Sequence, residues 1–249
     1  MYLGFRAFAL AFLLLTLLHT TVGALTRVDV GGGIGVDFSR ISSDDYLGLE
    51  SKPGVRIDGT LELGLSERLS VSTGVGFSQK GGRSAHFYEE VIILPRGTSG
   101  VSEITFDFDY LTLPLAAKLG FPLGDGDADR LRPYLEAGAE IGFLLSAKQT
   151  FEYTSPDGSV EYDAKDGSKL IDLSARFSAG LELPLGAATR SFLELGFVTG
   201  LTDVREEFPD DGFAHSNWRN ETVYLQLGLL RTVGGQLRGV ESSERAFPR

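Results

Sequence analysis

The chain has 249 residues, no cysteine and a formal net charge of −11. The lack of cysteine excludes disulfides, and the negative charge argues against nucleic acid as a partner, because a phosphate backbone requires a basic surface. Mean hydropathy is +0.02, and beyond the N-terminus no apolar run reaches the roughly 18 residues of a transmembrane helix. Glycine is abundant and helical periodicity is scarce, so we expect an all-β protein.

The first 24 residues have the layout of an export signal. Arg6 supplies a short positive region, Phe8–Leu18 is a continuous apolar core, and Val22–Ala24 offers small residues for cleavage. An uncleaved signal anchor is the alternative, which the single basic residue ahead of the apolar core weakens. We therefore predict a signal peptide over residues 1–24 and export of the remaining chain across an inner membrane.

Eight later segments alternate apolar residues with polar or small ones, the pattern of a strand with one apolar face. In one of them, Arg132–Ser146, Ile141 and Phe143 share one face while Glu136 and Glu140 share the other. A tilted strand of about ten residues crosses the roughly 25 Å apolar band of a membrane. The predicted strands are Val28–Phe38, Val55–Leu65, Leu69–Phe77, Tyr110–Phe121, Arg132–Ser146, Ile171–Leu185, Ser191–Leu201 and Val223–Leu229.

The connections between these strands alternate in length. Short ones are Ser66–Arg68, Pro122–Leu131 and Gly186–Arg190, and long polar ones are Ser39–Gly54, Ser78–Asp109, Ser146–Leu170 and Thr202–Thr222. In an outer-membrane barrel the short turns face the periplasm and the long loops face outward. Aromatic residues near strand ends fit two membrane-interface girdles. These are Phe38, Phe77, Phe143 and Trp218 on the outer side and Phe121, Tyr134 and Phe192 on the periplasmic side.

A soluble lipocalin-like or streptavidin-like barrel is the competing fold, and periodicity alone does not separate the two. The polar faces contain many glycine, serine and threonine residues and little lysine, which favours a narrow lumen over a water-facing surface. We therefore predict an eight-stranded antiparallel up-and-down transmembrane β-barrel of the outer-membrane type over residues 25–231. A periplasmic C-terminal tail is predicted over residues 232–249.

Three motifs occur in a fixed order along the predicted strands. They are Gly76–Gly81 (GFSQKG), Asp109–Leu115 (DYLTLPL), and Arg132–Leu135 (RPYL) followed by Gly138 and Gly142. Together they resemble the PorT-like outer membrane protein β-barrel family of Bacteroidota-type bacteria, over roughly residues 25–230. The resemblance implies an outer-membrane barrel, and members of the family share no active site. A role of this chain in protein secretion cannot be inferred from the fold alone. The chain departs from the usual pattern by continuing past its last strand.

Charged residues on the polar faces are candidates for the lumen. They are Arg56, Asp58, Glu62, Lys118, Glu136, Glu140, Asp172, Arg176, Glu182 and Glu194. Charges in a narrow lumen must pair, because isolated ones are costly. We expect a salt-bridge network that fills the barrel, and an ion- or proton-conducting path is the alternative. Acids outnumber bases in this set, so some carboxylates would be protonated or bound to water.

Other motifs give weak signals for a metal or a cofactor. Asp125–Asp129 has the spacing of a calcium loop, but Arg130 occupies the position of the usual glycine and Glu136 lies within a strand, so a solvated acidic turn is expected. His86 and His215 have no partner at ligand spacing. We therefore predict no metal site and no cofactor.

Catalytic signals are equally weak. Ser216 and His215 lie near Asp210 and Asp211, but nothing marks them as a triad. The Gly31–Gly35 run resembles a phosphate loop, yet no helix follows it, so it fits a bent strand. A lipid-modifying enzyme is thus a remote alternative, and we predict a protein that is not an enzyme.

The sequence therefore predicts a non-enzymatic outer-membrane barrel that supports the envelope or binds a partner. A small ion- or solute-conducting barrel is the alternative. Within the longest connection, Val91–Leu94 and Ile104–Phe108 indicate that the flanking strands extend above the membrane as a hairpin, and exposed β-hairpins bind partners by edge pairing. The expected partners are outer-membrane lipid, the barrel-insertion machinery and a protein at the outer loops. We expect a monomer.

Overall fold

The computed structural model describes residues 26–43, 49–84, 92–94, 97–99, 101–123, 131–153, 158–205 and 217–234. The predicted signal peptide, the acidic turn over residues 125–129, the two loop histidines with their neighbouring acids, and residues 235–249 of the predicted tail lie outside these ranges. Among the described residues, no helix is long and apolar enough to cross a membrane.

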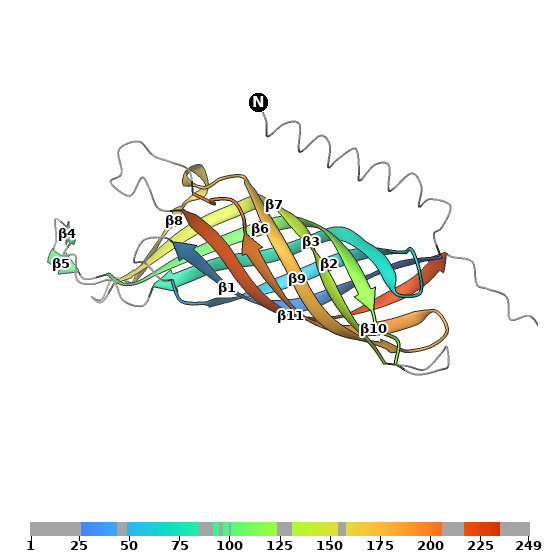
Figure 1. Cartoon of the computed structure of the whole chain (residues 1–249). Coiled ribbons are helices and arrows are strands. Elements are labelled where there is room, and N and C mark those ends of the chain that lie inside the picture. The colour runs from blue at the N-terminus through green and yellow to red at the C-terminus, as the bar shows by residue number, and fades with distance from the viewer. Residues whose placement is uncertain are drawn as a thin grey trace, which may run out of the picture.

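Eight long antiparallel strands form one closed sheet (Figure 1). They are β1 (Arg27–Ser43), β2 (Lys52–Gly64), β3 (Leu69–Ser84), β6 (Val101–Gly120), β7 (Arg132–Tyr153), β9 (Ile171–Pro184), β10 (Thr189–Gly200) and β11 (Trp218–Gly234). Each pairs with the next along the chain, and β11 pairs with β1 from Gly234 to Trp218. The predicted eight-stranded up-and-down barrel is therefore confirmed.

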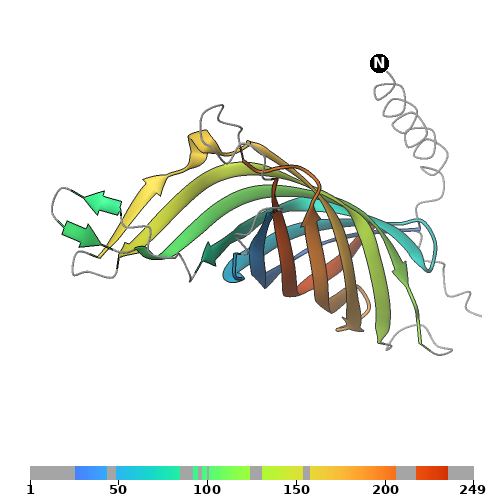
Figure 2. The same ribbon diagram turned by 60° about the vertical axis from the view of Figure 1, so that its left-hand side comes forward.

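Several strands are longer than predicted at the end that carries the long connections. β3 continues to Ser84, β6 begins at Val101, and β7 continues to Tyr153. These extensions lack the regular apolar-outward alternation, because strand segments that project past a lipid layer have no need of an apolar outer face. The predicted long loops are thus partly strand. Figure 2 shows β6 and β7 running beyond the other strands.

Smaller elements occupy the same end. A hairpin of β4 (Ile92–Leu94) and β5 (Gly97–Ser99) lies within the longest connection. The predicted extension of the flanking strands is seen for Ile104–Phe108, which belongs to β6 and pairs with β3 as far as Ser84, whereas Ile92–Leu94 pairs with β5 and not with that segment. β8 (Ser159–Asp163) pairs with the extended part of β7, and a single 3₁₀ turn follows it at Lys165–Gly167.

The outward-facing and inward-facing side chains differ sharply in polarity. Outward residues are apolar and exposed, for example Leu227 at 61% and Ile34 at 55%. Inward residues such as Arg56 and Glu140 are charged and fully buried. This arrangement is the reverse of a soluble barrel and is the one expected for strands surrounded by lipid, so the lipocalin-like alternative does not hold.

The predicted aromatic girdles are only partly correct. Phe38, Phe121 and Phe143 face outward, as predicted. Tyr134 and Phe192 are instead buried in the lumen, because their even positions share the inward parity of the charged residues. Trp218 was also assigned wrongly, and its indole ring packs edge-on against Phe106 at 5.3 Å between ring centroids.

Apolar side chains close the outer end of the barrel. This group, called the outer plug below, consists of Ile41, Leu49, Phe108, Tyr110, Leu144 and Ala147, with Phe106, Ala164 and Trp218 packed against it. These buried side chains form a hydrophobic core at the outer end of the barrel, above the charged lumen.

Candidate functional site

All ten charged residues predicted for the lumen lie inside the barrel, with at most 8% of the surface of each exposed. Five more charged residues join them: Arg27, Asp29, Asp37, Lys80 and Arg190. Buried charges are stable only when they are paired. The pairs form three clusters along the barrel axis.

The periplasmic cluster lies nearest the short turns and contains Arg27, Asp29, Glu62, Lys118, Glu182 and Arg190. Glu62 accepts hydrogen bonds from Lys118 and Arg27, both at 2.8 Å. Arg190 lies 2.8 Å from Asp29 and 3.1 Å from Glu182, and Lys118 also donates to Glu182. Each carboxylate therefore contacts at least two bases, which compensates its loss of water.

The central cluster surrounds Glu194 and contains Tyr134, Glu136, Arg176 and Tyr224. Glu194 accepts hydrogen bonds from the guanidinium of Arg176 at 2.9 Å and from the hydroxyls of Tyr134 and Tyr224 at 2.7 and 2.6 Å. Arg176 lies 3.6 Å from Glu136, and its guanidinium is 5.1 Å from the Tyr224 ring centroid, within cation–π range. These contacts link β7, β9, β10 and β11 across the lumen.

The outer cluster lies beneath the outer plug and contains Asp37, Arg56, Lys80, Glu140 and Asp172. Arg56 donates to Asp37 at 2.9 Å and to Glu140 at 3.2 Å. Lys80 bridges Glu140 at 3.2 Å and Asp172 at 3.4 Å. Glu140 also lies 3.7 Å from Arg176, which connects this cluster to the central one.

Glycines make room for the aromatic rings of the lumen. A Cβ atom at Gly196 would collide with the Tyr224 ring, and one at Gly180 would collide with Tyr134. Tyr110 lies over Gly142 in the same way, with its ring 3.0 Å from where a Cβ would be. The glycines of the inward faces therefore leave space for the lumen aromatics.

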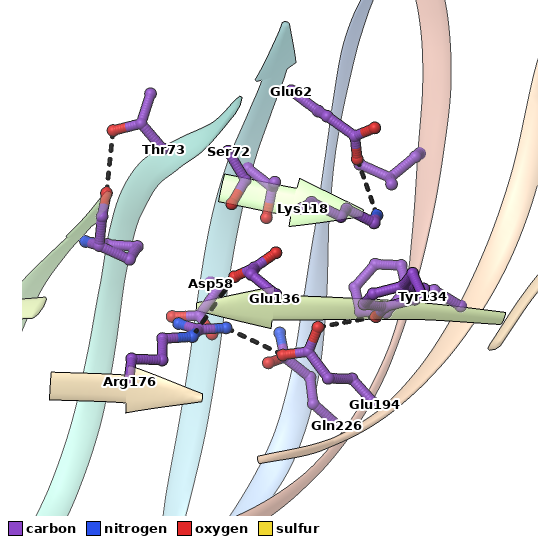
Figure 3. A pocket seen from close by; sticks show the side chains of 14 residues that line it. Asp58, Glu62, Ser72, Thr73, Lys118, Tyr134, Glu136, Arg176, Glu194 and Gln226 are labelled. Carbon is purple, nitrogen blue, oxygen red and sulfur yellow. Dashed lines mark hydrogen bonds and ion pairs between the residues drawn. The ribbon is translucent and has the colours of Figure 1, made fainter. Parts of the chain in front are cut away.

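A cavity of about 40 Å³ lies in the lumen, lined in part by Asp58, Thr60, Ser72, Glu136 and Gln226 (Figure 3). Such a volume holds only a few water molecules. Both carboxylate oxygens of Asp58 lack a hydrogen-bond donor among the described residues. The Arg56 guanidinium lies 3.7 Å away. Asp58 lies beside the outer and central clusters and is the lumen carboxylate with neither oxygen hydrogen-bonded among the described residues.

Sequence reasoning missed several members of the clusters for identifiable reasons. Lys80 lies beyond the predicted end of its strand, although its even position continues the inward parity. Arg190 was assigned to a turn. Asp29 and Asp37 lie on the polar face of the first predicted strand but were left out of the lumen set. The added bases Arg27, Lys80 and Arg190 reduce the predicted excess of acids.

Within the described ranges, no group of three or more histidine, cysteine, aspartate or glutamate side chains is arranged to hold a metal ion. The lumen clusters present paired charges and tyrosine hydroxyls already engaged by carboxylates. These ion pairs and hydrogen bonds connect the strands of the barrel. None of the charged side chains described above is arranged as an activated nucleophile.

A second candidate site is the outer sheet, formed by β8 and the extended ends of β6 and β7 (Figure 2). Its inner face, called the aromatic face, carries Phe106, Phe151, Val160 and Tyr162. Phe151 and Tyr162 pack edge-on at 5.6 Å. Its other face, called the acidic face, carries Asp107, Lys148, Glu152, Glu161 and Asp163.

The two faces arise from a bulge in β7. Pairing with β6 shifts so that Tyr110 lies opposite Leu144 while Asp109 lies opposite Ser146, leaving Leu145 as an extra residue. Inward positions on β7 therefore change from even to odd beyond this point. Lys148 lies 2.7 Å from Glu161 across the acidic face, and that hydrogen bond raises the pKa of Lys148.

Comparison with known proteins agrees with this architecture. A family model described as "Outer membrane protein beta-barrel domain" matches residues 21–206, and no curated protein matches the chain. Among solved structures, the chain is similar to Neisserial surface protein A, at 13% identity over 81% of this chain and 95% of that one, with a TM-score of 0.42. It is also similar to OprG from Pseudomonas aeruginosa, at 12% identity over 84% and 96%, with a TM-score of 0.40. For Ail of Yersinia pestis the values are 14% identity over 83% and 99%, with a TM-score of 0.36.

Proposed function

The chain belongs to the outer membrane protein β-barrel domain family, and from this premise we propose that it is a closed, non-conducting barrel that anchors a protruding β-sheet for partner binding. The outer membrane is the location that the family indicates. The narrower resemblance to PorT-like proteins, and with it any role in secretion, stays a prediction.

The observation that carries this proposal is the continuous filling of the lumen. Three ion-pair clusters follow one another along the axis, and the outer plug covers them. The cavity of about 40 Å³ beside the central cluster has the size of a few waters. An ion crossing the barrel would have to separate buried ion pairs, each costly to break, and then pass an apolar constriction.

The absence of an enzymatic role is part of the same proposal. The carboxylates of the lumen are held by arginine, lysine and tyrosine, so they have few free sites for substrate. The serine and histidine that sequence analysis considered for a triad lie outside the described residues. What projects from the membrane in the described part of the chain is a sheet, and sheets outside a membrane are suited to protein contacts.

Planar-bilayer recording of the refolded full-length chain tests the closed lumen. Correct insertion is checked first by heat-modifiable mobility on a gel. We expect no steady unitary conductance. As a matched pair, Arg176→Gln alters the lumen and Arg40→Gln alters an exposed outward-facing side chain. Steady channels in the wild type whose conductance changes in Arg176→Gln but not in Arg40→Gln would overturn the proposal in favour of a conducting barrel.

A further inference from the structure

The strand β8 leaves one backbone edge of the outer sheet unpaired. In the order of the main sheet β8 is terminal, with β7 as its neighbour on one side and no described strand on the other. All five of its residues are exposed. An edge of this kind offers free N–H and C=O groups to another strand.

Hydrogen bonds at the two ends of β8 identify which residues face the free edge. Ala164 donates its N–H to Ala147, and Tyr153 donates to Gly158. Antiparallel pairing alternates, so the residues at even positions of β8 direct their backbone groups toward β7. The N–H and C=O groups of Ser159, Glu161 and Asp163 therefore point to the open side.

The side chains of β8 set the chemistry of an incoming strand. Val160 and Tyr162 are 39% and 51% exposed on the aromatic face. Glu161 and Asp163 lie on the acidic face, where Lys148 is the facing base. An added strand would thus meet apolar side chains on one face and carboxylates on the other.

A second copy of this chain fits the edge poorly. Two β8 strands related by a two-fold axis through Glu161 would place the two Glu161 carboxylates directly opposite each other, and like charges in that position are destabilising. A basic strand has the complementary charge.

We propose that β8 is a docking edge for an extended segment of a partner protein in which basic residues alternate with apolar ones. The segment adds antiparallel to β8 as a further strand. Its basic residues lie opposite Ser159, Glu161 and Asp163 and exchange both backbone hydrogen bonds with them. Its apolar residues lie beside Val160 and Tyr162. This inference rests on the proposed role of the barrel as an anchor for partner binding.

Fluorescence anisotropy with labelled peptides tests the docking edge on the full-length barrel in nanodiscs. The probe is a peptide that alternates lysine with valine over the length of β8, and the matched control alternates glutamate with valine. We expect only the lysine peptide to bind. Methylation of its lysine backbone nitrogens, which face β8, should weaken binding about tenfold or more, because each lost hydrogen bond costs about 1 kcal/mol. Methylation of its valine nitrogens should change little.

Two protein variants separate the backbone from the charge. Glu161→Pro removes an N–H that faces the open side and so spares the β7–β8 bonds, and we expect about a tenfold loss of affinity. Glu161→Ala keeps the backbone donor and should cost about two- to fivefold, as for an exposed ion pair. The N-methylated peptides report on the wild-type protein, so they decide the question even if Glu161→Pro perturbs β8.

The contrary outcomes are distinct. Equal binding of the lysine and glutamate peptides, or of the two methylated peptides, would overturn the docking edge. Dimers of the wild-type chain that dissociate in Glu161→Pro would assign the edge to a second copy and likewise overturn it. If the barrel shows no conductance in planar bilayers and binds no peptide, only the docking edge is refuted. Steady conductance through the lumen refutes the closed-barrel function, irrespective of peptide binding.

Discussion

Replacement of Arg56 by methionine tests whether the lumen charges stabilise the barrel. Methionine keeps an unbranched apolar chain but has no guanidinium, so Asp37 loses a donor at 2.9 Å and Glu140 loses one at 3.2 Å. Arg56 is fully buried, and no bulk water is present to replace it. Removing one partner of a buried pair costs about 3–5 kcal/mol, and we expect the free energy of unfolding to fall by that amount.

The single tryptophan provides the assay. Trp218 packs against Phe106 in the outer plug, so its fluorescence should change when the barrel opens during urea unfolding from lipid vesicles. The double variant Arg56→Met/Asp37→Asn also removes the negative charge of Asp37, which has lost its arginine partner. We expect the double variant to recover roughly half of the loss in the free energy of unfolding. Arg40→Met breaks an exposed pair with Glu221 and should cost less than about 1 kcal/mol.

Two results would refute the reasoning. An Arg56→Met barrel as stable as Arg40→Met would mean that the buried pairs contribute nothing measurable. A double variant no more stable than the single one would mean that the loss arises from packing against the Tyr224 ring, over which the Arg56 guanidinium lies at 4.5 Å, and not from the uncompensated carboxylate.

Gly196→Ala should destabilise the barrel by more than about 1 kcal/mol, because a Cβ there collides with the Tyr224 ring, which lies within cation–π range of Arg56 and Arg176. Gly59→Ala on the outward face, where a Cβ meets only Val75 oxygen at 3.5 Å, should be nearly neutral, and equal urea midpoints for the two would contradict this. Asp58→Asn should leave the free energy of unfolding unchanged or raise it, because the Asp58 carboxylate has no hydrogen-bond donor among the described residues. Asp37→Asn loses hydrogen bonds to Arg56 and Ser78 and should lower the free energy of unfolding by about 1–3 kcal/mol. A larger loss for Asp58→Asn than for Asp37→Asn would show that water in the cavity stabilises the Asp58 carboxylate. Raising salt toward 1 M should scarcely move the unfolding midpoint of the wild type, because buried pairs are screened much less than exposed ones, and a large fall would place the clusters in contact with bulk solvent.

The barrel itself could be predicted because its physical signal is periodic. Every lipid-facing position must be apolar, so alternation marks each membrane-crossing segment, as in Arg132–Ser146. The charged lumen residues were predictable for the same reason, since a charge within such a segment has only the inward face available. The proximity of Arg176 to Glu136, Glu140 and Glu194 could be predicted from the order of their strands. Pairs such as Arg56 and Glu140 could not, because they come from strands far apart in the sequence and meet only through the closure of the sheet.

Beyond the membrane the apolar-outward periodicity ends. The outer ends of β3 and β7 are mixed in character because water accepts either kind of side chain, and they were assigned to loops, whereas Ile104–Phe108 of β6 was predicted as a strand extension. The inward aromatics Tyr134 and Phe192 were misplaced because position near a strand end was given more weight than parity. Parity was the better guide, as it reports directly on which side of the sheet a side chain lies.

The bulge at Leu145 separates two parts of β7 that are free to vary independently. Below it, a shift of one residue would send charged side chains into lipid, so chain length there is tightly constrained. Beyond Ala147 of the outer plug, the same shift would exchange only the aromatic and acidic faces of the outer sheet. The protruding end can therefore change its length and the pattern of its side chains while the wall that carries it keeps its register.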